Sequence, residues 1–241
     1  PVESFPVQLV VSIVPAGSGP DLRSRPVGTG PYRFVSASAD DRVVLARFDG
    51  YFKGQAANPG LILKIVPDDT MRGLELQHGG VDLVINDVPP DLVHALDGRG
   101  GLRVETAPGT DYAYIGLNAR DPVLSDARVR RALAYAVDRQ AIVTYLRRSL
   151  AGVASGVLPP ISWAVEPDVP RFDFNPDAAR RALDEAGYPD PDGNGPKPRL
   201  RLTLKISTNE FVRLQATVLQ ENFRNVGVEV DVRQYEFATL F

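Results

Sequence analysis

The feature that most constrains the fold is a strand–helix–strand pattern near the C-terminus. Apolar and polar residues alternate over residues 200–206 and again over 228–232, which predicts two strands that each bury one face. Between them, apolar residues recur at helical spacing after Asn209, a residue type that caps helices, and Gly227 is placed to end that helix. A helix that joins two short strands favours parallel pairing, so the pattern predicts an α/β layer.

A second pattern of this kind is predicted earlier in the chain. Residues 61–66 form an apolar run bounded by prolines, Asp68 or Asp69 can cap a helix that ends at residues 79–80, and residues 81–85 are again apolar. Two such units predict largely parallel strand pairing.

Three further elements are predicted from local signals. Residues 30–35 and 42–48 indicate an antiparallel hairpin. A helix opens at Ser125 or Asp126 and continues past a break near Asp138. Asn175–Pro176 combines a capping residue with proline at the first helical position and predicts a short helix that Gly187 ends.

Composition excludes several classes of function. The 241 residues carry a net charge of −3, so no basic surface for nucleic acid is indicated, and there is no cysteine for disulfides or thiolate chemistry. No stretch approaches the roughly 20 apolar residues that span a bilayer. The first six residues lack the basic and apolar regions of a signal peptide.

The candidate metal and catalytic motifs are incomplete. Residues 190–195 match the first half of a calcium loop, but Arg201 stands where the bidentate glutamate is needed, which favours a solvated turn. His78 and His94 have no metal-ligand spacing, and no G-x-S-x-G elbow is present. We therefore predict no catalytic residue, no metal and no cofactor.

The aromatic residues leave two interpretations open. Tyr112 and Tyr114 alternate with smaller residues on a segment expected to be extended, where they either pack in a sheet or border a ligand. Trp163 follows two prolines in an irregular loop and is either a lid over a ligand or a plug over the core.

Several segments, in order, resemble one family. The motifs are residues 26–32 (PVGTGPY), 65–72 (IVPDDTMR) with the glycines 79–80 and Asp82, 114–118 (YIGLN) leading into 126–139 (DARVRRALAYAVDR), 156–160 (GVLPP), 175–176 (NP) and 186–188 (AGY). Together they are similar to extracellular solute-binding family 5, the oligopeptide, dipeptide and nickel-type receptors of ABC importers.

The resemblance implies a fold of α/β class, like the type II periplasmic binding proteins, in which two lobes, each with a mixed sheet flanked by helices, close over a ligand. Family members are longer, so N- and C-terminal regions are expected to be missing from this chain. Residues 1–117 are then the later portion of the first lobe, and residues 118–241 the opening portion of the second.

The resemblance also implies where a ligand binds. Residues after the strand at 81–85 line the cleft, and the segment crossing between lobes borders it. The expected ligand-binding residues are Ile85, Asn86, Asp87, Tyr112, Tyr114, Asn118 and Trp163. Asn and Asp side chains suit hydrogen bonds to a peptide main chain.

The partners implied are a peptide or similar extended solute and a membrane permease, and no nucleic acid. The location implied is periplasmic or extracellular, with a lipoprotein anchor possible in the full-length protein. A binding protein rather than an enzyme is expected. A sensor or scaffold of the same fold stays open, and an α/β hydrolase is the remaining, disfavoured alternative.

Overall fold

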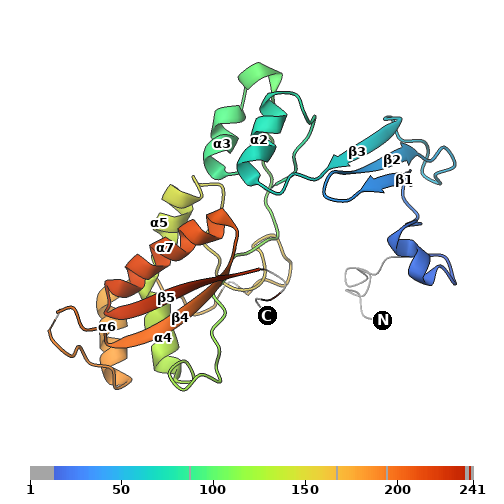
Figure 1. Cartoon of the computed structure of the whole chain (residues 1–241). Helices are drawn as coiled ribbons and strands as arrows, with labels where there is room; N and C mark the ends of the chain where they lie inside the picture. The colour runs from blue at the N-terminus through green and yellow to red at the C-terminus, as the bar shows by residue number, and fades with distance from the viewer. Residues whose placement is uncertain (1–13, 87, 167, 194, 237–238, 240–241) are drawn as a thin grey trace. The chain divides into compact units, whose positions relative to one another are not determined.

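The computed structural model describes residues 14–86, 88–166, 168–193, 195–236 and 239. The chain divides into two compact units, Pro1–Val88 and Pro89–Phe241 (Figure 1). The predicted lobe boundary at residues 117 and 118 concerns the fold of the whole protein and stays a prediction.

The first unit contains a three-stranded antiparallel sheet in the order β1-β2-β3. A short 3₁₀ helix η1 (Gly19–Arg23) precedes β1 (Tyr32–Ser38), β2 (Arg42–Arg47) and β3 (Gly60–Lys64). The predicted hairpin is confirmed. Gly60 is required here because a Cβ on it would lie 2.6 Å from the carbonyl oxygen of Leu45 on the neighbouring strand.

Helix α2 (Asp69–Gln77) follows β3 and begins where the sequence predicts. The Asp68 side chain accepts a hydrogen bond from the Met71 N–H at 2.8 Å, which caps the first turn. Arg72 Nη1 donates to the carbonyl oxygens of Val66 and Pro67, at 2.5 and 3.0 Å. The arginine of the IVPDDTMR motif therefore ties the helix to the loop before it.

The strand–helix–strand unit predicted over residues 61–85 is confirmed only in part, because its first strand and its helix form and its second strand does not. Residues 81–85 form no strand, and β3 pairs with β2 in antiparallel fashion instead. A strand exists only where a neighbour supplies the hydrogen-bond ladder, and no described strand lies along residues 81–85. For the same reason the extended segment around Tyr112 and Tyr114 belongs to no sheet. The pairing in the described residues is thus mixed rather than largely parallel.

The second unit holds the remaining elements. They are α3 (Pro90–Leu96), η2 (Arg99–Gly101), α4 (Ala127–Ala136), α5 (Arg139–Ala141), the π-helical turn η3 (Ile142–Leu146), α6 (Pro176–Glu185), β4 (Leu200–Ser207), α7 (Glu210–Arg224) and β5 (Val228–Tyr235).

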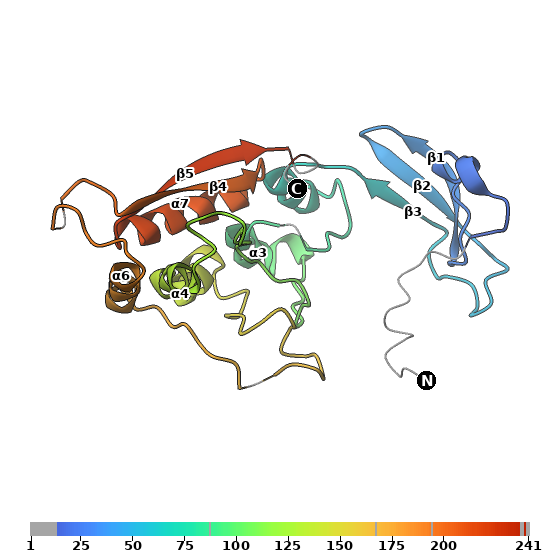
Figure 2. The same ribbon diagram turned by 90° about the horizontal axis from the view of Figure 1, so that it is seen from below.

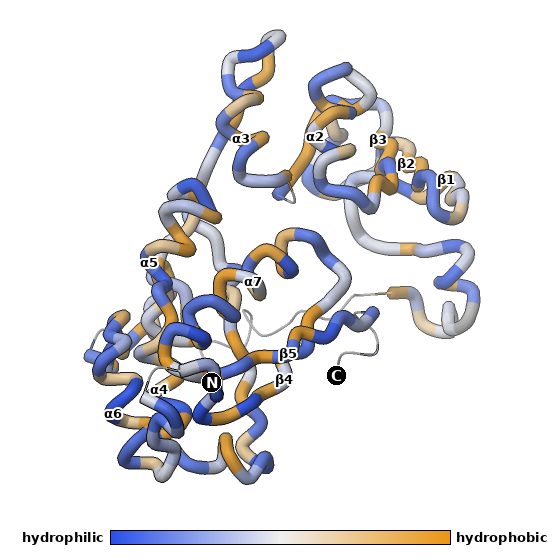
Figure 3. Tube along the Cα trace, turned by 60° about the vertical axis from the view of Figure 1, so that its left-hand side comes forward, coloured by the Kyte–Doolittle hydropathy of each residue, from blue (hydrophilic) through white to orange (hydrophobic). Residues whose placement is uncertain are grey.

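The strand–helix–strand unit predicted over residues 200–232 is confirmed. β4 and β5 are parallel neighbours in register from Leu200↔Val228 to Ser207↔Tyr235, and α7 connects them. Figure 2 shows α4, α6 and α7 together on one side of these two strands. The tube in Figure 3 changes between hydrophobic and hydrophilic along both strands, as alternating burial requires.

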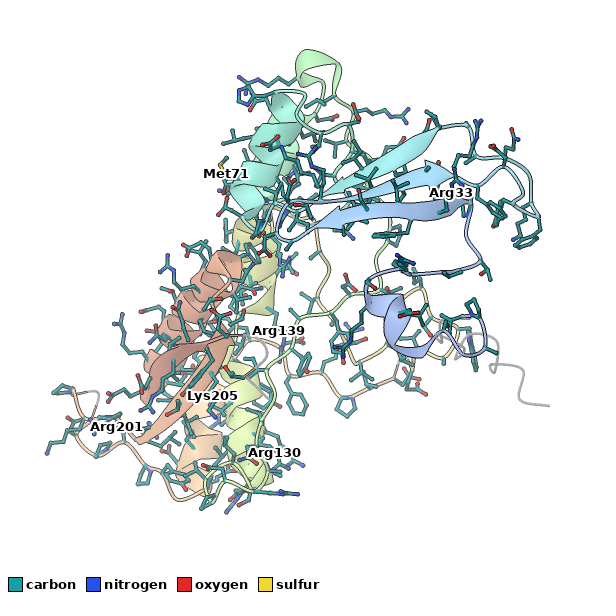
Figure 4. The ribbon with its side chains drawn as sticks, turned by 45° about the vertical axis from the view of Figure 1, so that its right-hand side comes forward. Arg33, Met71, Arg130, Arg139, Arg201 and Lys205 are labelled. Atoms are coloured by element: carbon teal, nitrogen blue, oxygen red, sulfur yellow. The ribbon has the colours of Figure 1, made fainter. Side chains whose placement is uncertain are left out.

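The hydrophobic core of the described residues lies in this layer. Its fully buried side chains come from α4, α6, β5 and the turn between α7 and β5, and include Val129, Ala179, Leu183, Val226 and Val228. The opposite face of the strands carries charged side chains, among them Arg201 and Lys205, which Figure 4 labels. One face is therefore packed and the other solvated.

The helix ends agree with the local signals. Side chains of Asp126, Asp138, Asn175 and Asn209 each accept a hydrogen bond from a backbone N–H in the first turn that follows. Gly187, after α6, and Gly227, after α7, both have φ in the left-handed region.

Arginines of the DARVRRALAYAVDR motif hold backbone carbonyls rather than pointing only to solvent. Arg130 donates to Leu124 and Ser125, both at 2.8 Å, and Arg139 donates to Phe172 at 2.6 Å. Arg130 lies near the start of α4 and Arg139 beyond its end (Figure 4). These contacts fix the loop before α4 and the segment before α6.

A search of the described helices finds none with the length and apolar character needed to cross a membrane.

Candidate functional site

Ile85 and Asn86 end the segment that follows α2. Ile85 is 73% exposed, and Leu83, two residues before it, is 71% exposed. Asn86 has φ of 58°, a left-handed conformation that asparagine tolerates better than most residues. Asp87 lies outside the described residues. The two described positions thus present an apolar side chain and an amide to solvent.

Tyr112 and Tyr114 form an aromatic pair in the second unit. Their ring centroids are 5.3 Å apart with a tilt of 33°, and Tyr114 is 68% exposed. Two rings two residues apart can meet only when both point to the same side of the chain. The segment therefore offers a small aromatic surface that no described element covers, which argues against ordinary sheet packing.

Asn118 closes the same segment. Its Oδ1 accepts a hydrogen bond from the Arg120 N–H at 3.1 Å, and its carbonyl accepts one from the Asp121 N–H at 3.0 Å. The side-chain oxygen thus takes part in a local turn, and the amide NH₂ is its remaining polar group.

Trp163 lies on an exposed loop. It is 87% exposed, and a turn holds the loop through a hydrogen bond from the Ser162 N–H to the Pro159 carbonyl at 2.8 Å. Ile161 beside it is 57% exposed. In the described residues Trp163 is therefore not a plug over the core.

The structure brings only part of the predicted set together. Tyr112 contacts Tyr114, whereas Ile85 and Asn86 belong to the other compact unit. A single site that contains all seven residues stays a prediction.

Sequence reasoning missed a cationic site between η3 and α7. The Cζ atom of Arg147 lies 4.3 Å from the ring centroid of Phe211, and partial burial lowers the pKa of Arg147. Phe211 is one of the apolar residues at helical spacing after Asn209, and that pattern predicts only a buried face of the helix. The available signal was an arginine just beyond a helix, but residues 64 positions apart cannot be paired from one sequence.

The turn that carries Arg147 has an unusual backbone. Arg148 and Ser149 both have left-handed φ, at 49° and 61°. His94 Nε2 lies 3.2 Å from the Arg148 carbonyl oxygen, and the Arg148 guanidinium forms an ion pair with Asp91. The turn is thus anchored to α3.

The remaining candidate motifs have local structural roles. Asp190 Oδ1 accepts hydrogen bonds from the N–H groups of Asp192 and Gly193, at 3.1 and 2.9 Å, as in the predicted turn. His78 Nδ1 lies 2.9 Å from the Leu74 carbonyl at the end of α2. No cluster of three possible metal ligands occurs in the parts of the chain that the structure describes.

An open groove of about 800 Å³ runs between α7 and β5. Gln220 Nε2 donates to the Val230 carbonyl oxygen at 2.9 Å, and Arg201 pairs with Glu229 at 2.8 Å. None of the predicted ligand residues lines it. The Gln220 side-chain amide therefore covers one backbone carbonyl of β5.

Comparison with known proteins identifies the family. Residues 4–241 match the family model described as bacterial extracellular solute-binding proteins, family 5 Middle. The chain is 29% identical to Heme-binding protein A of Haemophilus influenzae over 238 residues, which are 98% of this chain and 43% of that protein.

Solved structures give the same result. The oligopeptide-binding protein AppA of Bacillus subtilis, in complex with a nonapeptide, matches with a TM-score of 0.75 and 31% identity, over 89% of this chain and 44% of AppA. NikZ of Campylobacter jejuni, in complex with Ni(L-His), matches with a TM-score of 0.76 and 28% identity, over 91% of this chain and 45% of NikZ. The chain thus spans less than half the length of these relatives. It belongs to family 5 of the bacterial extracellular solute-binding proteins.

Proposed function

We propose that the whole protein is the extracytoplasmic substrate-binding component of an ABC importer, which captures a peptide or a similar carboxylate-bearing solute. The observation that carries this proposal is the family match over residues 4–241. Heme, a nonapeptide and Ni(L-His), the ligands in the names of the matched relatives, all contain carboxylate groups. A carboxylate is therefore the chemical feature that these ligands share.

In this proposal the ligand binds between two lobes, residues 1–117 and 118–241. Ile85, Asn86 and Asp87 contribute from the first, where the exposed Ile85 and the amide of Asn86 support the assignment. Tyr112 and Tyr114 border the ligand from the segment that crosses between the lobes, and Asn118 and Trp163 border it from the second lobe. The exposed Tyr pair is suited to stacking on a flat group. Closure of the lobes presents the ligand to a membrane permease in the periplasm or at the cell surface.

The experiment is isothermal titration of the full-length protein with the dipeptide Met-Leu, a nonapeptide, Ni(II) with L-histidine, heme and an oligosaccharide. We expect binding of at least one carboxylate-bearing ligand and none of the oligosaccharide. Tyr114→Ala is expected to weaken that binding by about 2- to 10-fold, since stacking on an aromatic ring contributes about 0.5–1.5 kcal/mol.

Phe52→Ala is the matched control, because Phe52 is also an exposed aromatic residue, at 76%, and is not among the predicted ligand residues. Binding of the oligosaccharide alone would reassign the substrate. Binding of no ligand at all would contradict the import function and favour a sensor or scaffold.

A further inference from the structure

Arg147 differs from the other arginines around α7. Arg213 and Arg224 on α7 and Arg233 on β5 each pair with a carboxylate of their own element. Among the described residues Arg147 has no ion pair, although it is partly buried against Phe211. An arginine stays protonated at any physiological pH, so this positive charge lacks the counter-charge that partial burial normally requires.

The surroundings of Arg147 add further positive potential. Phe211 is the second residue of α7, two positions after the cap Asn209, so the guanidinium lies at the N-terminal end of a 15-residue helix. The nearest acidic residue of that turn, Glu210, is held by Arg213, whose Nε donates to Glu210 Oε2 at 2.8 Å. The negative charge in the first turn is therefore already neutralised by another arginine.

This position is where an α/β layer offers its ligand crevice. Asn209 and α7 follow the carboxyl end of β4, which ends at Ser207. In open α/β sheets ligands bind outside the carboxyl ends of the strands. Arg147 therefore stands at the functional edge of the β4–α7–β5 layer, whereas Arg201 lies near the opposite end of β4.

The backbone around Arg147 is held in place. Arg148 and Ser149 adopt left-handed φ, which costs non-glycine residues about 1–2 kcal/mol each and persists only where surrounding contacts impose it. His94 and Asp91 of α3 supply those contacts. The π-helical turn η3 precedes Arg147, and such turns are frequent at functional sites. A guanidinium held this way binds an anion with little loss of conformational entropy.

We infer that Arg147, stacked on Phe211, binds a carboxylate group of the transported solute. The inference rests on the proposed function and specifies which residue recognises the anionic group. A guanidinium on an aromatic ring leaves its N–H edge free for two parallel hydrogen bonds to a carboxylate.

The test uses the full-length protein and compares Arg147→Gln with wild type. Both are titrated with Met-Leu and with Met-Leu amide, which lacks the terminal carboxylate. Wild type is expected to bind the acid about 10- to 100-fold more tightly than the amide, and Arg147→Gln is expected to lose this preference. Arg131→Gln, which removes an exposed arginine of α4, is the control and is expected to keep the preference.

An unchanged preference for the acid in Arg147→Gln, or equal binding of both peptides by wild type, would overturn the inference. The unfolding temperature of each variant verifies that it is folded. If wild type binds neither peptide, Met-Leu is not a ligand of this protein and that part of the proposed function is contradicted. A second measurement then tests independently whether Arg147 binds a carboxylate.

That second measurement follows the Nε–H signals of arginines by NMR while acetate is added at constant ionic strength. The Arg147 signal is assigned by its absence in Arg147→Gln. A saturable shift of this signal, with the Arg131 signal unchanged, supports a carboxylate site at Arg147. Equal shifts of both signals, or no shift, would overturn it.

Discussion

The Asn222 side chain accepts a hydrogen bond from the backbone N–H of Asp138 at 2.9 Å, across 84 residues of sequence. Asn222 lies on α7, and Asp138 lies in the break between α4 and α5, where its own side chain caps the next turn. The contact is partly buried. It joins the helix behind the parallel strands to the turn that leads toward Arg147.

Asn222→Ala is predicted to destabilise the fold by about 1–3 kcal/mol, because it leaves the partly buried N–H of Asp138 without a partner. Urea denaturation followed by circular dichroism measures the change. Asn225→Ala, three residues further along, removes an exposed amide and serves as the control. Equal losses for the two variants would show that the long-range hydrogen bond adds no stability.

Leu183→Ala is predicted to destabilise the fold by about 2–5 kcal/mol. Leu183 is 0% exposed in the core between α6 and the rest of its unit, and truncation leaves a cavity as well as removing apolar burial. Leu214→Ala on α7 is the matched control, because Leu214 is 39% exposed and is expected to give a clearly smaller loss. A comparable loss at Leu214 in urea denaturation would contradict the placement of the core.

Gly187→Ala is predicted to destabilise by about 1–2 kcal/mol, because φ at this position is +94° and an L-residue is strained there. A Cβ would meet no atom within 4 Å, so the cost is conformational rather than steric. Gly152→Ala, at a position with equal space and no positive φ, is expected to be neutral or stabilising by up to about 1 kcal/mol. The unfolding temperature should therefore fall in Gly187→Ala and stay the same or rise in Gly152→Ala. Equal shifts of the unfolding temperature in the two variants would refute the conformational explanation.

Local signals in the sequence predicted the elements whose partners are also local. The β4–α7–β5 unit is complete within about 36 residues, so alternation, the Asn209 cap and Gly227 were sufficient. Residues 81–85 have an equally apolar pattern, yet they form no strand. An apolar pattern predicts that a segment can be buried, but it does not predict which neighbouring strand would pair with that segment.

The candidate site was predictable only in part. An exposed Tyr114 and an exposed Trp163 agree with the expectation that they border a ligand, but exposure is not contact with one. Arg147 could not be found from the sequence, since its significance depends on Phe211 lying beneath it and on the absence of a carboxylate beside it in the described residues. Both are properties of tertiary packing. Likewise, the hydrogen bonds from Arg130 and Arg139 to backbone carbonyls could not be predicted, because such a contact leaves no pattern in the sequence.

The cap of α4 is predicted to make stability depend on pH below about 4. The pKa of Asp126 lies below its ordinary value. The main cause is the hydrogen bond that its carboxylate accepts from the Arg128 guanidinium, and the second is the one that it accepts from the Arg128 backbone N–H. A carboxyl group whose pKa is lowered by folding adds stability above its unfolded pKa and loses it as pH falls through the folded pKa. Asp126→Asn keeps an oxygen for the N–H but cannot ionise. Wild type should therefore be more stable than this variant at pH 6, and the difference should vanish toward pH 2.5 in urea denaturation.

Asp111→Asn is the control for removing a carboxylate from the same compact unit, because Asp111 is exposed and makes no hydrogen bond or ion pair with the described residues. A difference between wild type and Asp126→Asn that stays constant from pH 6 to pH 2.5 would show that the cap acts through hydrogen-bond geometry alone. A difference that disappears at low pH would assign the effect to the ionised carboxylate, whose charge pairs with Arg128 and complements the N-terminal end of α4.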